Sequence, residues 1–171
     1  MAKKNASKTK ALNPLGGDDR IAIVGGVRTP FVKAWADLKD WTEATLGREA
    51  VNELINRTEL DPNLIDEVII GCVSAPMDGP NVGREVVLRS QVPNGVPATT
   101  VQMYCASSAY AVVNACGDIM SGVADVVIAG GVESMSSARA RYSLPLTHAL
   151  QEVSKARNIQ DRFKAFTDLR A

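Results

Sequence analysis

Short apolar runs alternate with longer amphipathic stretches along most of this chain. The apolar runs lie at residues 21–24, 67–71, 97–104 and 125–129 and are rich in valine, isoleucine and threonine. Runs of this length and composition predict buried β-strands. Between them, three stretches carry apolar side chains at helical spacing and predict α-helices; they lie at residues 42–57, 81–91 and 105–121.

This alternation of strands and helices predicts the fold class. Continuous apolar strands that are separated by helices are typical of a mostly parallel sheet with helices on both faces. We therefore expect an α/β fold. The pattern changes after residue 132, and residues 147–168 predict an amphipathic, basic helix outside this arrangement.

The composition excludes several classes of protein. With 46% hydrophobic and 22% charged residues in 171, the chain has the composition of a globular domain rather than a disordered or disulfide-stapled one. The 19 basic and 19 acidic residues balance, which argues against a nucleic-acid partner. Because no apolar run is long enough to cross a bilayer, and no secretory signal begins the chain, we expect a cytoplasmic protein without a transmembrane segment.

The charges are unevenly distributed. Residues 1–20 carry five basic and two acidic side chains, residues 21–138 carry seven basic and fourteen acidic, and residues 139–171 carry seven basic and three acidic. We predict a flexible basic tail over residues 1–19, an α/β domain over residues 20–136 and a separate segment over residues 137–171. The basic residues of the last segment could meet a charged ligand or form a solvated surface.

The chain has three cysteines and one histidine. Such sparse cysteines are typical of a reducing compartment, and none has the spacing of a zinc site, so we expect no metal. Cys105 lies where a predicted strand leads into a helix, and the free N–H groups and dipole of a helix N-terminus favour a thiolate and can hold an oxyanion. Cys105 is therefore a candidate nucleophile; the alternative is a small buried cysteine that only fills space.

The helix that follows Cys105 is dominated by small residues, which predicts that it is buried on all sides. Cys116 lies three turns further along that helix, and we interpret it as a core residue. Cys72 follows a predicted strand, and we expect it to be semi-exposed with nothing nearby to activate it.

Four stretches together resemble one protein family, the thiolases. They are residues 23–31 (Ile-Val-Gly-Gly-Val-Arg-Thr-Pro-Phe), 81–85 (Asn-Val-Gly-Arg-Glu), 105–108 (Cys-Ala-Ser-Ser) and 128–136 (Ile-Ala-Gly-Gly-Val-Glu-Ser-Met-Ser). The resemblance is to the N-terminal part of the family, in the family's order, and residues 155–170 look like the start of the loop region in 3-ketoacyl-CoA thiolases of the trifunctional, β-oxidation type. It implies that residues 137–171 begin a loop insertion.

The resemblance also implies a function. Cys105 would be the acyl-thioester nucleophile of an acyltransferase that cleaves 3-ketoacyl-CoA with CoA in fatty-acid β-oxidation. Coenzyme A would be a co-substrate, no cofactor would be bound permanently, and the protein would be a homo-oligomer, a dimer or tetramer. No CoA-binding residue is assigned.

The chain departs from the family pattern at several points. Ser107-Ser108 stand where most thiolases have Ser-Gly, and Gln102 stands where many have asparagine. Neither the family's Gly-His-Pro nor its Cys-x-Gly motif occurs, and we interpret the single His148 as a surface residue. We therefore expect a thiolase that needs a C-terminal half; the alternative is a non-catalytic truncated chain, or a subunit that needs a complementary partner.

Gly25-Gly26 follow a predicted strand, so a nucleotide-binding module is a third class to weigh. No Gly-x-Gly-x-x-Gly follows them, and Pro30 opposes the helix that would bind a pyrophosphate. The sequence therefore disfavours it.

Overall fold

The computed structural model describes residues 21–138, 142–156, 158–160 and 162. The chain divides into two compact units, Met1–Ala138 and Arg139–Ala171. The predicted tail over residues 1–19 lies outside the described residues. The first unit contains the sheet and the four stretches that resemble the thiolases, whereas the second contains the α-helix α4 (Leu144–Lys155).

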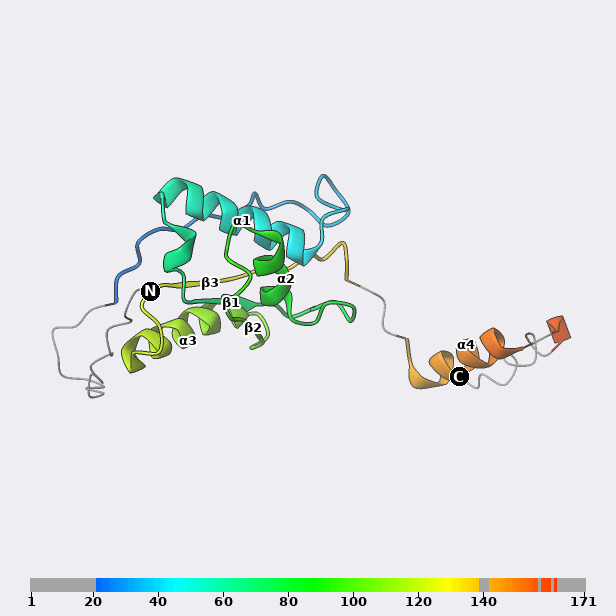
Figure 1. Cartoon of the computed structure of the whole chain (residues 1–171). Helices are drawn as coiled ribbons and strands as arrows, with labels where there is room; N and C mark the ends of the chain where they lie inside the picture. Colours follow the sequence, from blue (N-terminus) through cyan, green and yellow to red (C-terminus); the bar gives the residue numbers. More distant parts are fainter. Residues whose placement is uncertain (1–20, 139–141, 157, 161, 163–171) are drawn as a thin grey trace. The chain divides into compact units, whose positions relative to one another are not determined.

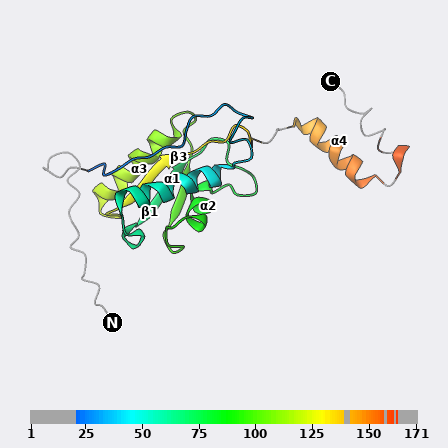
Figure 2. The ribbon, with the colours of Figure 1, turned by 90° about the horizontal axis from the view of Figure 1, so that it is seen from above.

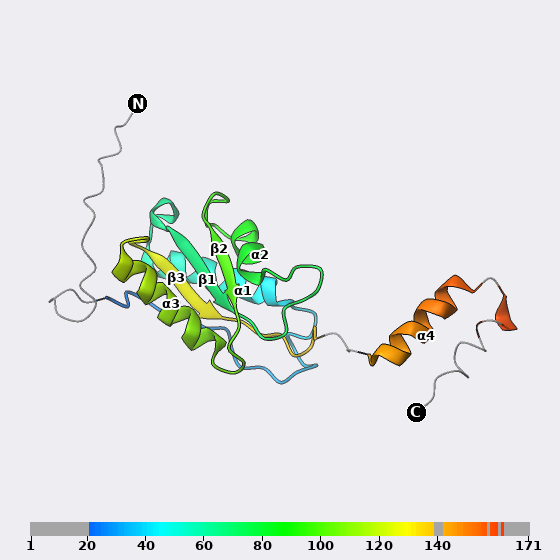
Figure 3. The same ribbon diagram turned by 90° about the horizontal axis from the view of Figure 1, so that it is seen from below.

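The centre of the first unit is a parallel three-stranded sheet in the order β2-β1-β3 (Figure 3). Its strands are β1 (Glu67–Gly71), β2 (Ala98–Val101) and β3 (Val127–Gly131). In register, Val68 pairs with Ala98 on one side and with Ile128 on the other. Because β1 has a neighbour on both edges and helices on both faces, its uninterrupted apolar run is buried as the sequence predicted.

Helices cover both faces of this sheet. α1 (Glu43–Thr58) and α2 (Val82–Arg89) lie on one face, and α3 (Ser107–Ser121) lies on the other (Figures 1 and 2). Successive β1 side chains alternate between these layers, since Val68 and Ile70 join the core under α1 and α2, whereas Ile69 packs with Ala111 and Ala115 of α3. The predicted α/β class is confirmed.

Capping side chains explain where the helices begin and end. Thr42 Oγ1 accepts a hydrogen bond from the Thr45 N–H at the start of α1, and Asn81 Oδ1 accepts one from the Arg84 N–H at the start of α2. α3 ends at Gly122, whose φ of 73° is the left-handed conformation that glycine adopts most easily. Between α1 and β1, the chain forms the 3₁₀ turn η1 (Pro62–Leu64).

The prediction of a strand at residues 21–24 is wrong. This segment forms no strand, and Ile23 and Val24 are 87% and 86% exposed. The apolar, β-branched composition is that of a strand, but a strand also needs a hydrogen-bonding neighbour, and in the described sheet β3 pairs only with β1.

Other predicted boundaries shift, and one burial prediction is wrong. β2 is shorter than predicted, β3 extends through Gly130 and Gly131, and the helix predicted over residues 147–168 is α4, ending at Lys155; residues 157, 161 and 163–168 lie outside the described ones. The small-residue helix α3 is not buried on all sides, because Val113 and Met120 are 64% and 54% exposed. Only the side of α3 that faces the sheet is covered.

Candidate functional site

The candidate site lies at the carboxyl ends of the three parallel strands. The segments that follow β1, β2 and β3 all leave the sheet at this edge, which is where ligands bind in open α/β sheets. These segments comprise residues 72–75, 102–106 and 132–137. The second of them carries the predicted nucleophile.

Cys105 is exposed on the turn between β2 and α3. The helix begins two residues later, at Ser107, so Cys105 lies before its first turn rather than within it. The first-turn N–H groups of a helix point outward at its N-terminus, and Ala106, the N-cap, makes no side-chain capping bond there. This exposure argues against the alternative in which Cys105 only fills space in the core.

The start of α3 packs directly on the sheet. A Cβ atom placed on Gly71 would lie 2.4 Å from the main-chain carbonyl of Ser107, and one on Gly131 would lie 2.4 Å from Ser108 Cβ. Only glycine leaves room for this approach. Two glycines at strand ends therefore set the position of the helix that follows Cys105.

The main chain of Val73 connects the three segments. Its N–H donates to Glu133 Oε2 at 2.9 Å, and its carbonyl accepts a hydrogen bond from Gln102 Nε2 at 2.8 Å. The second carboxylate oxygen of Glu133 accepts from the Ser74 N–H at 3.0 Å. The segments after β1, β2 and β3 are thus tied to one another, and Gln102 belongs to the segment that carries Cys105.

Two serines fix the segment after β3 to the region where α1 begins. Ser134 Oγ donates to the Trp41 carbonyl at 2.8 Å, and Ser137 Oγ donates to Glu43 Oε1 at 2.6 Å. The Glu43 side chain is only 1% exposed, and its other oxygen, Oε2, has no hydrogen-bond partner among the described residues. Sequence reasoning singled out none of these contacts as functional, and only the Glu-Ser-Met-Ser motif marked this segment.

Cys72 is buried, not semi-exposed as predicted. It is the residue after β1 and is 2% exposed, because the segments around it cover the end of the strand. Burial, together with the negative charges of Glu133 and Glu43, raises the pKa of the Cys72 thiol to about 12. The raised pKa agrees with the expectation that Cys72 is not activated.

The third cysteine, Cys116, and the single histidine, His148, both lie on helices. Cys116 is half-buried on α3 rather than fully in the core, because α3 is covered on one side only. His148 is exposed on α4, which confirms that it is a surface residue. Across the described residues, no group of three or more His, Cys, Asp and Glu side chains could hold a metal ion.

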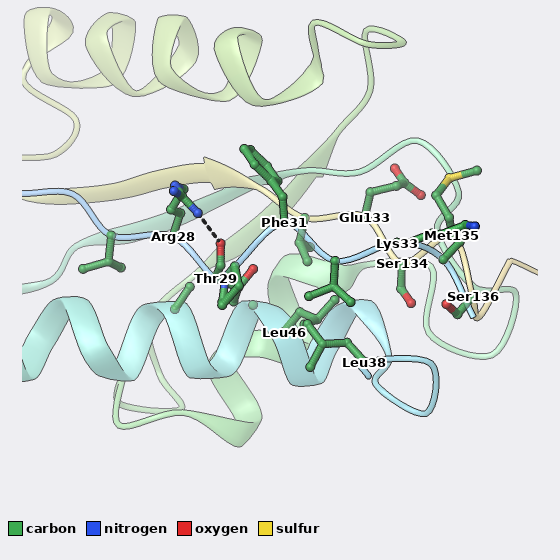
Figure 4. Close-up of a pocket in the computed structure, with 18 residues that line it drawn as sticks. Arg28, Thr29, Phe31, Lys33, Leu38, Leu46, Glu133, Ser134, Met135 and Ser136 are labelled. Atoms are coloured by element: carbon green, nitrogen blue, oxygen red, sulfur yellow. Dashed lines mark hydrogen bonds between the residues drawn. The ribbon is translucent and has the colours of Figure 1, made fainter. Parts of the chain in front are cut away.

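A cavity of about 430 Å³ opens beside the candidate site, between the Arg28-Thr29-Pro30-Phe31 turn, α1 and the segment after β3 (Figure 4). The Arg28 guanidinium donates to the Thr29 carbonyl at 3.1 Å and lies 5.0 Å from the centroid of the Phe31 ring. Glu133 and Ser134 line the opposite wall, whereas Cys105 is not among the lining residues. The cavity therefore shares Glu133 with the network around Val73 but does not contain the thiol.

The helices of the described part of the chain include none that is long and apolar enough to cross a bilayer.

Comparison with known proteins gives consistent matches. The sequence model described as "Thiolase, N-terminal domain" matches residues 21–168. A 3-ketoacyl-CoA thiolase of Aeromonas salmonicida is 41% identical over 152 residues, which are 89% of this chain and 35% of that protein. One of Pseudoalteromonas translucida is 37% identical over 170 residues, covering 99% of this chain and 38% of its own length.

Two solved structures are similar to the first unit's fold. The acetyl-CoA acetyltransferase of Bacillus anthracis superposes with a TM-score of 0.68 at 34% identity, over 71% of this chain and 31% of that one. A thiolase of Ascaris suum, solved in complex with coenzyme A, superposes with a TM-score of 0.67 at 30% identity, over 71% of this chain and 32% of that one. The chain spans about a third of the length of the relatives it matches.

Proposed function

The chain belongs to the thiolase family through its N-terminal domain, and on this premise we propose that it supplies the nucleophile of a thiolase-type acyltransferase. The observation that carries the proposal is the placement of Cys105: an exposed thiol on the strand-to-helix turn, at the carboxyl edge of a parallel sheet and before the N-terminus of α3. A thiol placed there suits a thioester intermediate.

The proposed substrate is a 3-ketoacyl-CoA, and coenzyme A is the co-substrate rather than a bound cofactor. The Cys105 thiolate attacks the 3-keto carbonyl, the bond between C2 and C3 breaks, and acetyl-CoA leaves after C2 takes a proton. A second CoA then gives up its thiol proton to the base, and its sulfur attacks the thioester carbonyl, which breaks the bond to Cys105, releases the acyl-CoA and restores the Cys105 thiolate. The relatives named 3-ketoacyl-CoA thiolase support this substrate class.

We infer that the acid and base of the two steps lie outside these 171 residues. Its one histidine is exposed on α4, and the Gly-His-Pro and Cys-x-Gly motifs are not in its sequence. Because each general acid–base contribution is worth about 10²–10⁴-fold in rate, we propose that a complementary C-terminal half provides these groups. The alternative, a non-catalytic thiolase chain, predicts that Cys105 carries no acyl group.

Three finer statements complete the proposal. We place the reaction in fatty-acid β-oxidation, because the relatives are named for 3-ketoacyl-CoA. We place it in the cytoplasm, because the three cysteines are free thiols. We also infer a homo-oligomer, which sedimentation of the protein would test.

The test is acylation of the thiol. The chain is incubated with acetoacetyl-CoA or acetyl-CoA, and its cysteine peptides are analysed by mass spectrometry. We expect an acetyl thioester on Cys105, its loss in Cys105→Ser and its retention in the matched variant Cys116→Ser. An unmodified Cys105, or equal acylation of Cys116, would contradict the proposal. Multiple-turnover thiolysis by this chain alone would overturn the need for groups from elsewhere.

A further inference from the structure

The turn that carries Cys105 contains a strained residue. Tyr104, immediately before the cysteine, has a φ of 47°, a conformation that bulky side chains rarely adopt. The residue is 81% exposed, so packing of its side chain does not impose that conformation. Cys105 is exposed as well, so the position of its thiol depends on the main-chain turn.

The side chain of Ser107 closes this turn from the other side of the cysteine. Ser107 Oγ accepts a hydrogen bond from the Met103 N–H at 2.8 Å and donates one to the Tyr104 carbonyl at 2.6 Å. The Ser107 N–H donates to the same carbonyl at 3.0 Å. A single hydroxyl thus bonds the N–H of the residue before Tyr104 and the carbonyl of Tyr104 itself.

Ser107 is itself held firmly. It is 4% exposed, and its main chain lies against Gly71, where a Cβ atom would approach within 2.4 Å. The hydroxyl therefore connects the turn to a part of the molecule that is fixed on the sheet. Burial also restricts the rotamer of the Ser107 side chain, whereas an exposed side chain would change rotamer freely.

We propose that Ser107 is a positioning residue: its hydroxyl holds Tyr104 in the left-handed conformation and so keeps the Cys105 thiol before the N-terminus of α3. The role rests on the proposed function of Cys105 as the acyl carrier. Ser107 does not touch the reacting atoms, and it acts only through the main chain of residues 103–105.

The test compares Ser107→Ala with the neighbouring variant Ser108→Ala in the full 171-residue chain. The readout is the rate at which iodoacetamide alkylates Cys105 at neutral pH. Without the Ser107 hydroxyl, Tyr104 returns to an ordinary φ and the thiol leaves its exposed position before α3, where iodoacetamide reaches it; we expect the rate to fall about threefold. Ser108→Ala keeps the Cβ that packs on Gly131, and we expect no change.

A second substitution separates positioning from a general loss of structure. Tyr104→Gly in the Ser107→Ala background supplies a residue that adopts positive φ without strain, and we expect it to restore at least half of the lost rate. Cys72 reports on the fold, since it stays unreactive while the core is intact. An unchanged rate in Ser107→Ala overturns the proposal. A reduced rate that Tyr104→Gly does not restore also overturns it, whether or not Cys72 stays unreactive.

Failure of the proposed function gives a different result. If Cys105 of the unchanged chain takes no acyl group from acetyl-CoA, the acyl-carrier role fails. The alkylation comparison needs no acyl donor, so it still decides whether Ser107 positions the thiol.

Discussion

The carboxylate of Glu133 accepts a hydrogen bond from the main-chain N–H of Val73, with 2.9 Å between Oε2 and N, although 60 residues separate them in the sequence. Because Gln102 Nε2 donates to the carbonyl of the same Val73, the segments after all three strands share one residue as an anchor. The network places the family's Glu-Ser-Met-Ser motif and the cysteine turn in one arrangement.

Glu133→Gln should loosen this anchor. Glutamine keeps one acceptor oxygen but turns an NH₂ group toward either the Val73 or the Ser74 N–H, so one of the two hydrogen bonds is lost. We expect the free energy of unfolding to fall by about 1–3 kcal/mol, measured as a shift of the urea midpoint.

Asp125→Asn is the matched control for Glu133→Gln, because it makes the same chemical change on an exposed side chain. Its effect should stay within about 0.5 kcal/mol. Equal urea midpoints for the two variants would show that the bonds to Val73 and Ser74 contribute nothing to stability.

Gly71→Ala should be among the most damaging single substitutions in the sheet. The new methyl group would lie 2.4 Å from the carbonyl carbon and oxygen of Ser107. To relieve this contact, the strand or the helix would have to move and weaken its backbone hydrogen bonds. We expect a loss of about 3 kcal/mol, the upper end of the usual range for overpacking. Thermal or urea denaturation measures it.

Gly117→Ala, within α3, provides the contrast. A Cβ atom at Gly117 meets nothing within 4 Å, and alanine is the better helix former, so this variant should gain about 0.5–1 kcal/mol. If Gly71→Ala and Gly117→Ala change stability in the same direction, the close approach between β1 and α3 is not the cause.

The parts of this fold that depend on local sequence could be predicted. The apolar run at β1 and the Thr42 cap of α1 need only neighbouring residues, and both are found where the pattern placed them. The segment at residues 21–24 shows the limit, because its composition is that of a strand but pairing depends on a partner elsewhere in space.

The candidate site shows the same division. Its nucleophile candidate could be found from the sequence because a cysteine between a strand and a helix is a local pattern. Glu133 and Ser107 could not be assigned roles, since their partners, Val73 and the carbonyl of Tyr104, are main-chain groups that no side-chain pattern identifies. Cys72 could not be placed because its burial depends on segments that pack over it.

The three thiols should react with iodoacetamide in the order Cys105, Cys116, Cys72. Cys105 is exposed, Cys116 is half-buried, and Cys72 is buried with its pKa raised to about 12, so almost no Cys72 thiolate exists at neutral pH. Peptide mapping after timed alkylation measures the order. In 8 M urea, as the control, the differences should disappear. Rapid labelling of Cys72 in the native chain would contradict the order.

Glu67 and Asp118 should make the stability of the chain depend on pH. Both line a cavity of about 390 Å³ between α3 and the sheet. Burial and then the charge of Asp118 raise the pKa of Glu67 above its ordinary value of 4.5. A raised folded-state pKa means that this contribution to stability is complete below the unfolded-state pKa and is lost as pH rises through the folded-state value.

Asp118→Asn therefore tests the pair. It removes the like charge beside Glu67, so it should increase the free energy of unfolding at pH 7 and change it less at pH 4, because the raised pKa leaves Glu67 largely protonated there. Urea midpoints of variant and parent at both pH values measure the difference, and Glu67→Gln should show the same pH dependence because it removes the other charge. Asp125→Asn, exposed and outside the pair, should show none. A stabilisation by Asp118→Asn that is equal at pH 4 and pH 7 would place its cause outside the interaction with Glu67.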